Sequence, residues 1–178
     1  MMQTPAPSDF ETQTNATYDA LMWALSRPGM ARKLPVAGQA SLIAALIDRE
    51  CAIFSDDVHL MQIAAQAGAQ IVAQNDADHL FLSATPDPSI LSVLRQGTDI
   101  YPEDGATLVM PAVIGHGMAL RLTGPGVDGA VSIKIDGIPD AFWTARRDVM
   151  RYPMGFDIFI IDQDQIIGIP RSTAIEVL

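Results

Sequence analysis

The chain has 178 residues, enough for one compact domain that buries roughly 70% of its unfolded surface without a stabilising metal or disulfide. Its net charge of -10 at pH 7 argues against nucleic acid and anionic membrane as partners, because both repel an acidic protein. A single cysteine, Cys51, excludes an internal disulfide and a multi-cysteine metal centre. The apolar residues after Cys51 predict a buried strand with this thiol as a small core side chain.

The N-terminus predicts neither export nor membrane insertion. Residues 1–8 lack the basic region and apolar core of a signal peptide, and no apolar run reaches the ~20 residues of a membrane span. We therefore expect a cytoplasmic protein, with a flexible tail over residues 1–9 and a single α/β domain over 10–178. Only 18% of residues are charged, against about 25% in a typical soluble domain, and 49% are hydrophobic. This apolar surplus favours a permanent protein partner.

The first half of the chain is predicted to be mainly helical. Ser8 to Glu11 form a capping box that starts a helix, and Ser-Arg-Pro-Gly at 26–29 ends it. Further patterns predict a helix over 41–49, a strand over 51–55, and a helix that Asp57 caps and that stops near Gly68. A short apolar run at 79–82 predicts a strand buried on both faces.

The second half predicts more strands than helices. A helix over 88–96 precedes a hairpin with strands at 107–114 and 118–123. A strand at 130–135 and a helix at 139–150 follow, and strands at 156–161 and 166–169 pair through an acidic turn. Early helices and late hairpins predict a layered α/β domain with a mixed, partly antiparallel sheet flanked by helices.

The segment Thr123-Gly-Pro-Gly-Val-Asp-Gly129 raises the question of a phosphate-binding loop. A P-loop needs glycines followed by Lys-Ser/Thr at a helix start, and the dinucleotide fingerprint needs three spaced glycines between strand and helix. This segment lies between two predicted strands, and Pro125 removes one amide donor. A structural corner is the favoured interpretation, and a backbone nest that binds an anion is the alternative.

Two arginines occupy positions from which a guanidinium can reach a ligand. Arg27 lies in the Pro-Gly turn, and Arg171 follows Pro170 directly after an apolar strand. A guanidinium in such a position can bind phosphate or carboxylate, and it can equally hold a partner subunit or a nearby aspartate. The candidate anion or interface contacts are Arg27, Gly29, Gly124, Gly126 and Arg171.

Other catalytic patterns are weak. Asp76, Asp78 and His79 come closest to a metal cluster, but a solvated strand entry explains the two acids equally well. The chain has no Gly-x-Ser-x-Gly elbow, and neither of its two lysines, Lys33 and Lys134, is well placed for a pyridoxal Schiff base. We therefore expect no catalytic residue, no cofactor and no metal.

Nine fragments follow one another from about residue 10 to the C-terminus. They are Phe10 with Gln13, Ala24-Leu-Ser-Arg-Pro-Gly29, Leu46-Ile-Asp48, Ala77-Asp78, Gly97, Tyr101-Pro-Glu103 with Gly105-Ala-Thr107, Leu122-Thr-Gly-Pro-Gly126, Tyr152-Pro-Met-Gly155 with Asp157, and Ile169-Pro-Arg-Ser-Thr173. In this order and spacing, the fragments resemble the PhnH family, which supplies a subunit of the bacterial carbon-phosphorus lyase machinery.

The resemblance implies a fold similar to the large domain of pyridoxal-phosphate-dependent transferases without the cofactor. It also implies a role in phosphonate catabolism, where PhnG, PhnH, PhnI and PhnL are linked to forming α-D-ribose 1-methylphosphonate 5-triphosphate from ATP and methylphosphonate. Because the family assigns nucleosidase chemistry to PhnI and carbon-phosphorus cleavage to PhnJ, an accessory or assembly role is left for this chain. The implied partners are a second copy of the isolated chain, and PhnG, PhnI, PhnJ and PhnL in the complex.

A competing hypothesis is a small nucleotide- or phosphonate-binding α/β enzyme. It would use Arg27, the Gly124-Pro-Gly126 corner and Arg171 to hold a phosphorylated ligand. The resemblance favours the accessory role over this alternative.

Overall fold

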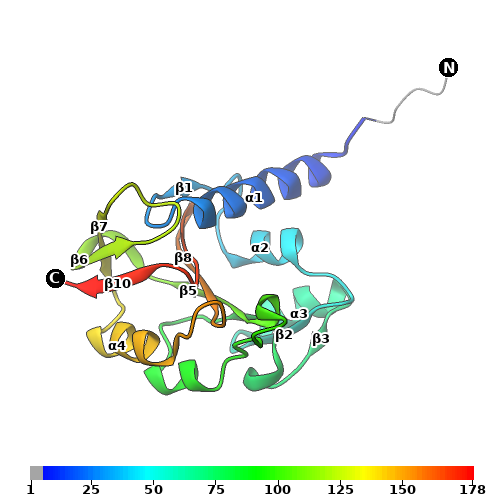
Figure 1. Cartoon of the computed structure of the whole chain (residues 1–178). Coiled ribbons are helices and arrows are strands. Elements are labelled where there is room, and N and C mark those ends of the chain that lie inside the picture. The colour runs from blue at the N-terminus through cyan, green and yellow to red at the C-terminus, as the bar shows by residue number, and fades with distance from the viewer. Residues whose placement is uncertain (1–5) are drawn as a thin grey trace.

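The computed structural model describes residues 6–178, and its largest element is a seven-stranded sheet (Figure 1). In spatial order the strands are β1 (Arg32–Lys33), β9 (Gln165–Ile169), β8 (Asp157–Asp162), β5 (Thr107–Pro111), β4 (His79–Phe81), β2 (Ala52–Ser55) and β3 (Gln70–Ile71). Strands β8, β5, β4, β2 and β3 run parallel, whereas β9 is antiparallel to both of its neighbours. The expected mixed, partly antiparallel sheet is confirmed.

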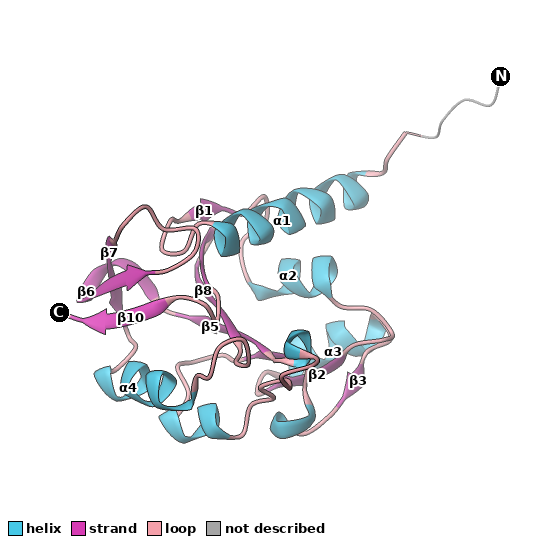
Figure 2. Ribbon diagram, in the orientation of Figure 1, coloured by secondary structure: helices cyan, strands magenta, loops and turns pink. Residues whose placement is uncertain are grey.

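Helices and a second, smaller sheet pack on this sheet and build an α/β fold of layers (Figure 2). One face carries α1 (Asp9–Ser26), α2 (Gln39–Leu46) and α3 (Val58–Gln66). The other face carries α4 (Asp140–Val149), the 3₁₀-helix η2 (Pro88–Ser92) and an antiparallel sheet in the order β10 (Ala174–Val177), β6 (Val113–Thr123) and β7 (Val131–Asp136). None of the helices within residues 6–178 has the length and apolar character that crossing a membrane requires.

The central strands divide the hydrophobic core into two clusters. Leu108 and Ile158 belong to the cluster that contains Phe142 of α4. Their chain neighbours Val109 and Phe159 belong to the cluster beneath α1, α2 and α3. Because successive side chains of a strand point to opposite faces, these apolar runs are buried on both sides, as is typical of parallel strands covered by two layers. The strand predicted at 79–82 is confirmed as β4 in this environment.

The capping box predicted at the start of α1 is confirmed. Ser8 Oγ accepts from the backbone N–H of Glu11 at 3.2 Å, and Glu11 Oε2 accepts from the backbone N–H of Ser8 at 2.7 Å. The helix therefore begins at Asp9, and it ends before Pro28 as predicted. Residues 1–5 of the expected tail lie outside the described residues.

The predicted hairpin of 107–114 with 118–123 is wrong. β5 pairs instead with β4 and β8 in the large sheet, and β6 runs without interruption through Gly115 and Gly117 to pair with β7. The β6–β7 register shifts between Ile114 and Met118, and both glycines have positive φ, so they form an irregularity inside a strand rather than a turn. The true hairpin is β6–β7, and the Gly-Pro-Gly segment connects its strands.

Several other boundaries and elements differ from the predictions. The helix predicted at 88–96 is only the 3₁₀-helix η2, and the helix predicted at 41–49 begins at Gln39 and ends at Leu46. Strands β1 and β3 are two residues long, too short for a periodic pattern, and β10 was also not predicted. The helix capped by Asp57, the helix α4 and the β8–β9 hairpin match their predictions closely.

Candidate functional site

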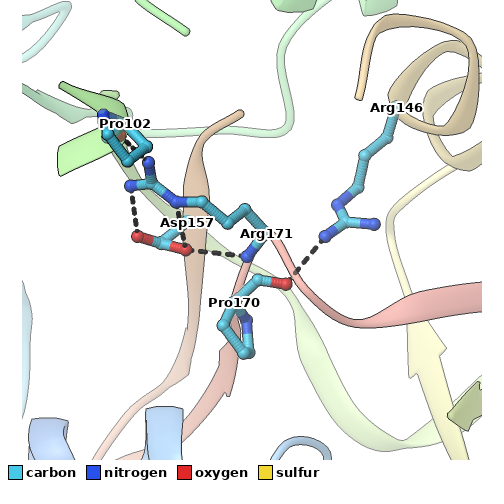
Figure 3. Close-up of polar contacts among 5 residues, drawn as sticks. All are labelled: Pro102, Arg146, Asp157, Pro170 and Arg171. Carbon is cyan, nitrogen blue, oxygen red and sulfur yellow. Dashed lines mark hydrogen bonds and ion pairs between the residues drawn. The ribbon is translucent and has the colours of Figure 1, made fainter. Parts of the chain in front are cut away.

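Arg171 is held by hydrogen bonds from all three nitrogens of its guanidinium (Figure 3). Nη2 donates to Asp157 Oδ2 at 2.7 Å, Nε donates to Asp157 Oδ1 at 3.3 Å, and Nη1 donates to the carbonyl oxygen of Pro102. The backbone N–H of Arg171 also donates to Asp157 Oδ1, at 2.7 Å. Of the roles that the sequence left open for Arg171, contact with a nearby aspartate is the one seen in the structure.

The β8–β9 hairpin brings this pair together. Ile158 and Ile169 are register partners, so the hairpin places Asp157 beside the chain that leaves β9 at Pro170 and Arg171.

Gly105 packs closely against this ion pair. A Cβ atom on Gly105 would lie 2.0 Å from the carbonyl oxygen of Gly155 and 2.7 Å from Arg171 Nη1. No residue larger than glycine fits at position 105 without displacing the backbone or the arginine.

The Gly-Pro-Gly corner packs against the ends of two other elements. Gly126, at φ +82°, would place a Cβ 2.4 Å from the carbonyl oxygen of Ser26 at the end of α1. Gly124, at φ +127°, would place one 2.8 Å from the carbonyl oxygen of Ser172. Both glycines are explained by positive φ and by close backbone contact. The corner predicted from the sequence is confirmed, and it lies between the chain segments that carry Arg27 and Arg171.

Gly29 and Arg27 complete the set of candidate residues. Gly29, at φ +81°, packs against β6, where a Cβ would lie 2.7 Å from Leu122 Cδ1. The Arg27 guanidinium lies 5.0 Å from the ring centroid of Trp23, and Arg32 lies at the same distance from that ring. Unlike Arg171, Arg27 is exposed and has no carboxylate partner within the described chain.

Arg146 is a buried charge that the sequence reasoning missed. Its side chain extends from α4, and Nη2 donates to the carbonyl oxygen of Pro170 at 3.0 Å (Figure 3). Nη1 donates to the carbonyl oxygen of Thr173, also at 3.0 Å. Burial lowers the pKa of Arg146 to about 10, which leaves it charged at neutral pH. A signal was present, because Phe142, Trp143 and Arg146 fall on one helical face, and a cation on an apolar face requires a partner.

The acidic segment before β4 has a structural role. The Asp78 carboxylate forms an ion pair with Arg95 and accepts from the backbone N–H of Ala52 at 2.8 Å. Burial lowers the pKa of His79, which keeps this imidazole neutral at pH 7. Within residues 6–178, no group of three His, Cys, Asp or Glu side chains could hold a metal ion.

Cys51 lies just before β2 and is partly buried against the helical side of the core. Burial raises the pKa of its thiol, which favours the unreactive protonated form. The thiol is therefore a packing residue at the margin of the core, whereas the sequence predicted a core position inside the strand.

Comparison with known proteins identifies the family. Residues 5–176 match the sequence model of the family described as bacterial phosphonate metabolism protein (PhnH). The match covers nearly the whole chain. The chain belongs to the PhnH family. The resemblance seen in the nine sequence fragments is thereby confirmed.

Two relatives extend this comparison. HtxG of Stutzerimonas stutzeri, named as a proposed C-P lyase subunit, is 31% identical over 173 residues that cover 89% of this chain and 83% of the relative. A protein of Rhizobium meliloti (strain 1021), named α-D-ribose 1-methylphosphonate 5-triphosphate synthase subunit PhnH, is 27% identical over 187 residues. That alignment covers 94% of this chain and 91% of the relative. In this family member, the fragments with Pro102, Gly155, Asp157 and Arg171 meet around one ion pair.

Proposed function

We propose that this chain is an accessory subunit of the carbon-phosphorus lyase complex in phosphonate catabolism. In that role it supports the formation of α-D-ribose 1-methylphosphonate 5-triphosphate from ATP and methylphosphonate. The observation that carries the proposal is the family match over residues 5–176. The names of both relatives, one a proposed C-P lyase subunit and one a synthase subunit, support the same role.

The contacts of the ionic side chains favour an accessory role over a catalytic one. Displacement at a glycosidic carbon requires carboxylates beside the sugar and cationic groups or metal ions on the triphosphate. Here Asp157 is engaged by Arg171, and Asp78 is engaged by Arg95. These two carboxylates are held by arginines within the fold, which supports assigning the chemistry to another subunit.

The proposed partners are a second copy of the isolated chain, and PhnG, PhnI and PhnJ in the complex, with PhnL as a further candidate. The exposed side of α1 supports a protein contact. Phe10, Tyr18 and Met22 are solvent-accessible, and their spacing of eight and four residues places them along one side of the helix. The exposed Arg27 lies near the end of this helix, and we assign it to the same interface rather than to an anion. Size-exclusion chromatography with light scattering tests the dimer, and Tyr18→Lys is expected to dissociate it.

We further propose that residues 10–178 form a single domain, and that the protein is cytoplasmic. We also propose that this domain is a cofactor-free version of the large domain of pyridoxal-phosphate transferases. The parallel centre of the sheet and the helices on its face support this relationship. Lys33 Nζ lies 3.1 Å from Asp164 Oδ2 with its side chain 79% exposed, and Lys134 is exposed on β7, so neither amine has the buried setting of a Schiff-base lysine. Titration with pyridoxal phosphate should therefore give no Schiff-base absorbance, and a stable aldimine would contradict this assignment.

Gene deletion with complementation tests the pathway role. The deletion strain should fail to grow on methylphosphonate as sole phosphorus source, should grow normally on phosphate, and should recover with the intact gene. Growth of the deletion strain on methylphosphonate at the parental rate would contradict the proposal.

A further inference from the structure

A second cationic feature lies beside the Arg171 ion pair. A cavity of about 290 Å³ separates α4 from the chain that runs from β9 into β10. This volume is many times that of one water molecule. It is close to the smallest volumes of pockets that bind small ligands, roughly 300 Å³. The cavity is lined by Arg146, Arg147 and Arg171, and none of its lining residues is acidic.

Three residues that line this cavity also carry buried polar atoms without a hydrogen-bond partner. Within the described residues, six buried side-chain nitrogen or oxygen atoms have no hydrogen-bond partner, and three of them belong to lining residues. These three are Trp143 Nε1, Arg146 Nε and Thr173 Oγ1, and each of the three residues is at most 3% exposed. Buried polar atoms in native proteins almost always have a partner, so this clustering indicates a missing one.

The chemistry of the three atoms specifies that partner. The indole N–H and the guanidinium Nε–H can only donate, and the threonine hydroxyl can donate as well as accept. The partner must therefore carry several acceptor atoms, and the charge on Arg146 favours an anion.

The local charge balance also favours an anion. Arg171 is neutralised by Asp157, and Arg147 lies 3.7 Å from Asp148 in a largely solvated pair. Arg146 is hydrogen-bonded only to the carbonyl oxygens of Thr173 and Pro170, so its charge has no carboxylate in contact. Exposed Arg147 and Tyr152 line the same cavity, so its solvent-facing side is cationic and polar.

We propose that this cavity binds the terminal PO₃ group of a small phosphate or phosphonate, through Trp143, Arg146 and Thr173. A tetrahedral oxyanion offers three acceptor oxygens, whereas a monocarboxylate offers two. The site is distinct from the Gly124-Pro-Gly126 corner and from Arg27. It stands on the cavity itself and does not depend on the accessory role in the lyase complex.

Ligand titration of the full chain tests the proposal. The probes are inorganic phosphate, methylphosphonate and ATP. Sodium acetate and sodium chloride at matched ionic strength are the controls. Binding is measured by calorimetry and by thermal unfolding. At least one of the three phosphorus compounds should release or absorb heat and raise the Tm in a saturable way, because a ligand of the native state stabilises it. The comparison separates free phosphate, free phosphonate and the end of a nucleotide as sources of the group.

Two conservative variants connect binding to the cavity. Thr173→Val keeps the side-chain shape and removes the hydroxyl, and Trp143→Phe removes the indole N–H. Because both atoms are unpaired without ligand, neither variant loses a hydrogen bond in ligand-free buffer, and the Tm of Trp143→Phe should fall only through the packing lost with the smaller ring. Each should bind the phosphorus compound about tenfold or more weakly, since a hydrogen bond to a charged group is lost. Arg146 is not replaced, because its guanidinium also holds two backbone carbonyls.

Arg49→Gln is the matched control for charge, since Arg49 is exposed and remote from the cavity lining. It should bind as the wild type does, whereas Arg147→Gln at the mouth should bind more weakly. The proposal is overturned if no phosphorus compound raises the Tm at millimolar concentration, which would leave ordered water as the partner of these atoms. It is equally overturned if Thr173→Val and Trp143→Phe bind with wild-type affinity.

Discussion

Replacing Arg171 with alanine tests the ion pair at the centre of the family fragments. The change removes two side-chain hydrogen bonds to Asp157 and one to the Pro102 carbonyl, whereas the backbone N–H at position 171 still donates to Asp157 at 2.7 Å. Breaking a buried pair on one side costs roughly 3–5 kcal/mol. The Arg171 and Asp157 side chains are 15% and 20% exposed, so we expect the lower end, about 3 kcal/mol.

Urea unfolding followed by circular dichroism measures this loss, with an unchanged m-value as the sign that the folded state is intact. A loss of this size corresponds to a Tm decrease of roughly 6–12 °C for a chain of this length. Asp157→Ala and the double variant complete a thermodynamic cycle, and the double variant should cost at least about 1 kcal/mol less than the sum. Arg49→Ala, at an exposed arginine, should change the free energy of unfolding by less than about 0.5 kcal/mol. A loss below about 1 kcal/mol for Arg171→Ala, or additive effects of the two single variants, would show that the ion pair does not stabilise the fold.

Three further predictions concern packing and titration. Gly126→Ala should destabilise by about 2–4 kcal/mol, because strain at positive φ adds to overlap with the Ser26 carbonyl oxygen. Gly129→Ala, at φ +68° with nothing within 4 Å of a Cβ, should cost only about 1–2 kcal/mol, and equal urea midpoints would contradict the packing argument. The lowered pKa of His79 means that the unfolded chain binds the proton first, so stability should fall as pH drops through about 6.5 toward the folded pKa. His79→Gln should make the free energy of unfolding less steep between pH 7 and 5, and an unchanged slope would refute this. The raised pKa of Cys51 predicts slower alkylation by iodoacetamide at pH 7 than in urea, and equal rates would count against it.

The sequence predicts what short-range patterns determine. The capping box at Ser8 and Glu11, the Asp57 cap and the β8–β9 hairpin each depend on residues close in the chain, and all three are present. The pairing of β5 with β8 joins segments about fifty residues apart, and no local pattern encodes it. The predicted hairpin failed for this reason, since Gly115 and Gly117 are equally compatible with a turn and with an irregular strand.

The candidate site shows the same division. The hairpin register accounts for the contact between Arg171 and Asp157, which are 14 residues apart, but nothing local predicts the Pro102 carbonyl, 69 residues away. Arg146 could have been found, because its position on the apolar face of α4 is visible in the sequence. Its partners are backbone carbonyls, and those depend on where the chain passes after β9.

Affinity purification from the native host shows whether this chain works as a subunit of the lyase complex. A tagged copy of this chain, expressed at its natural level in cells grown on methylphosphonate, should bring down PhnG, PhnI and PhnJ in fixed stoichiometry. The assembly should form ribose methylphosphonate triphosphate from ATP and methylphosphonate, and the chain alone should not. Recovery of the chain without these subunits, or turnover by the chain alone, would rule out the accessory role.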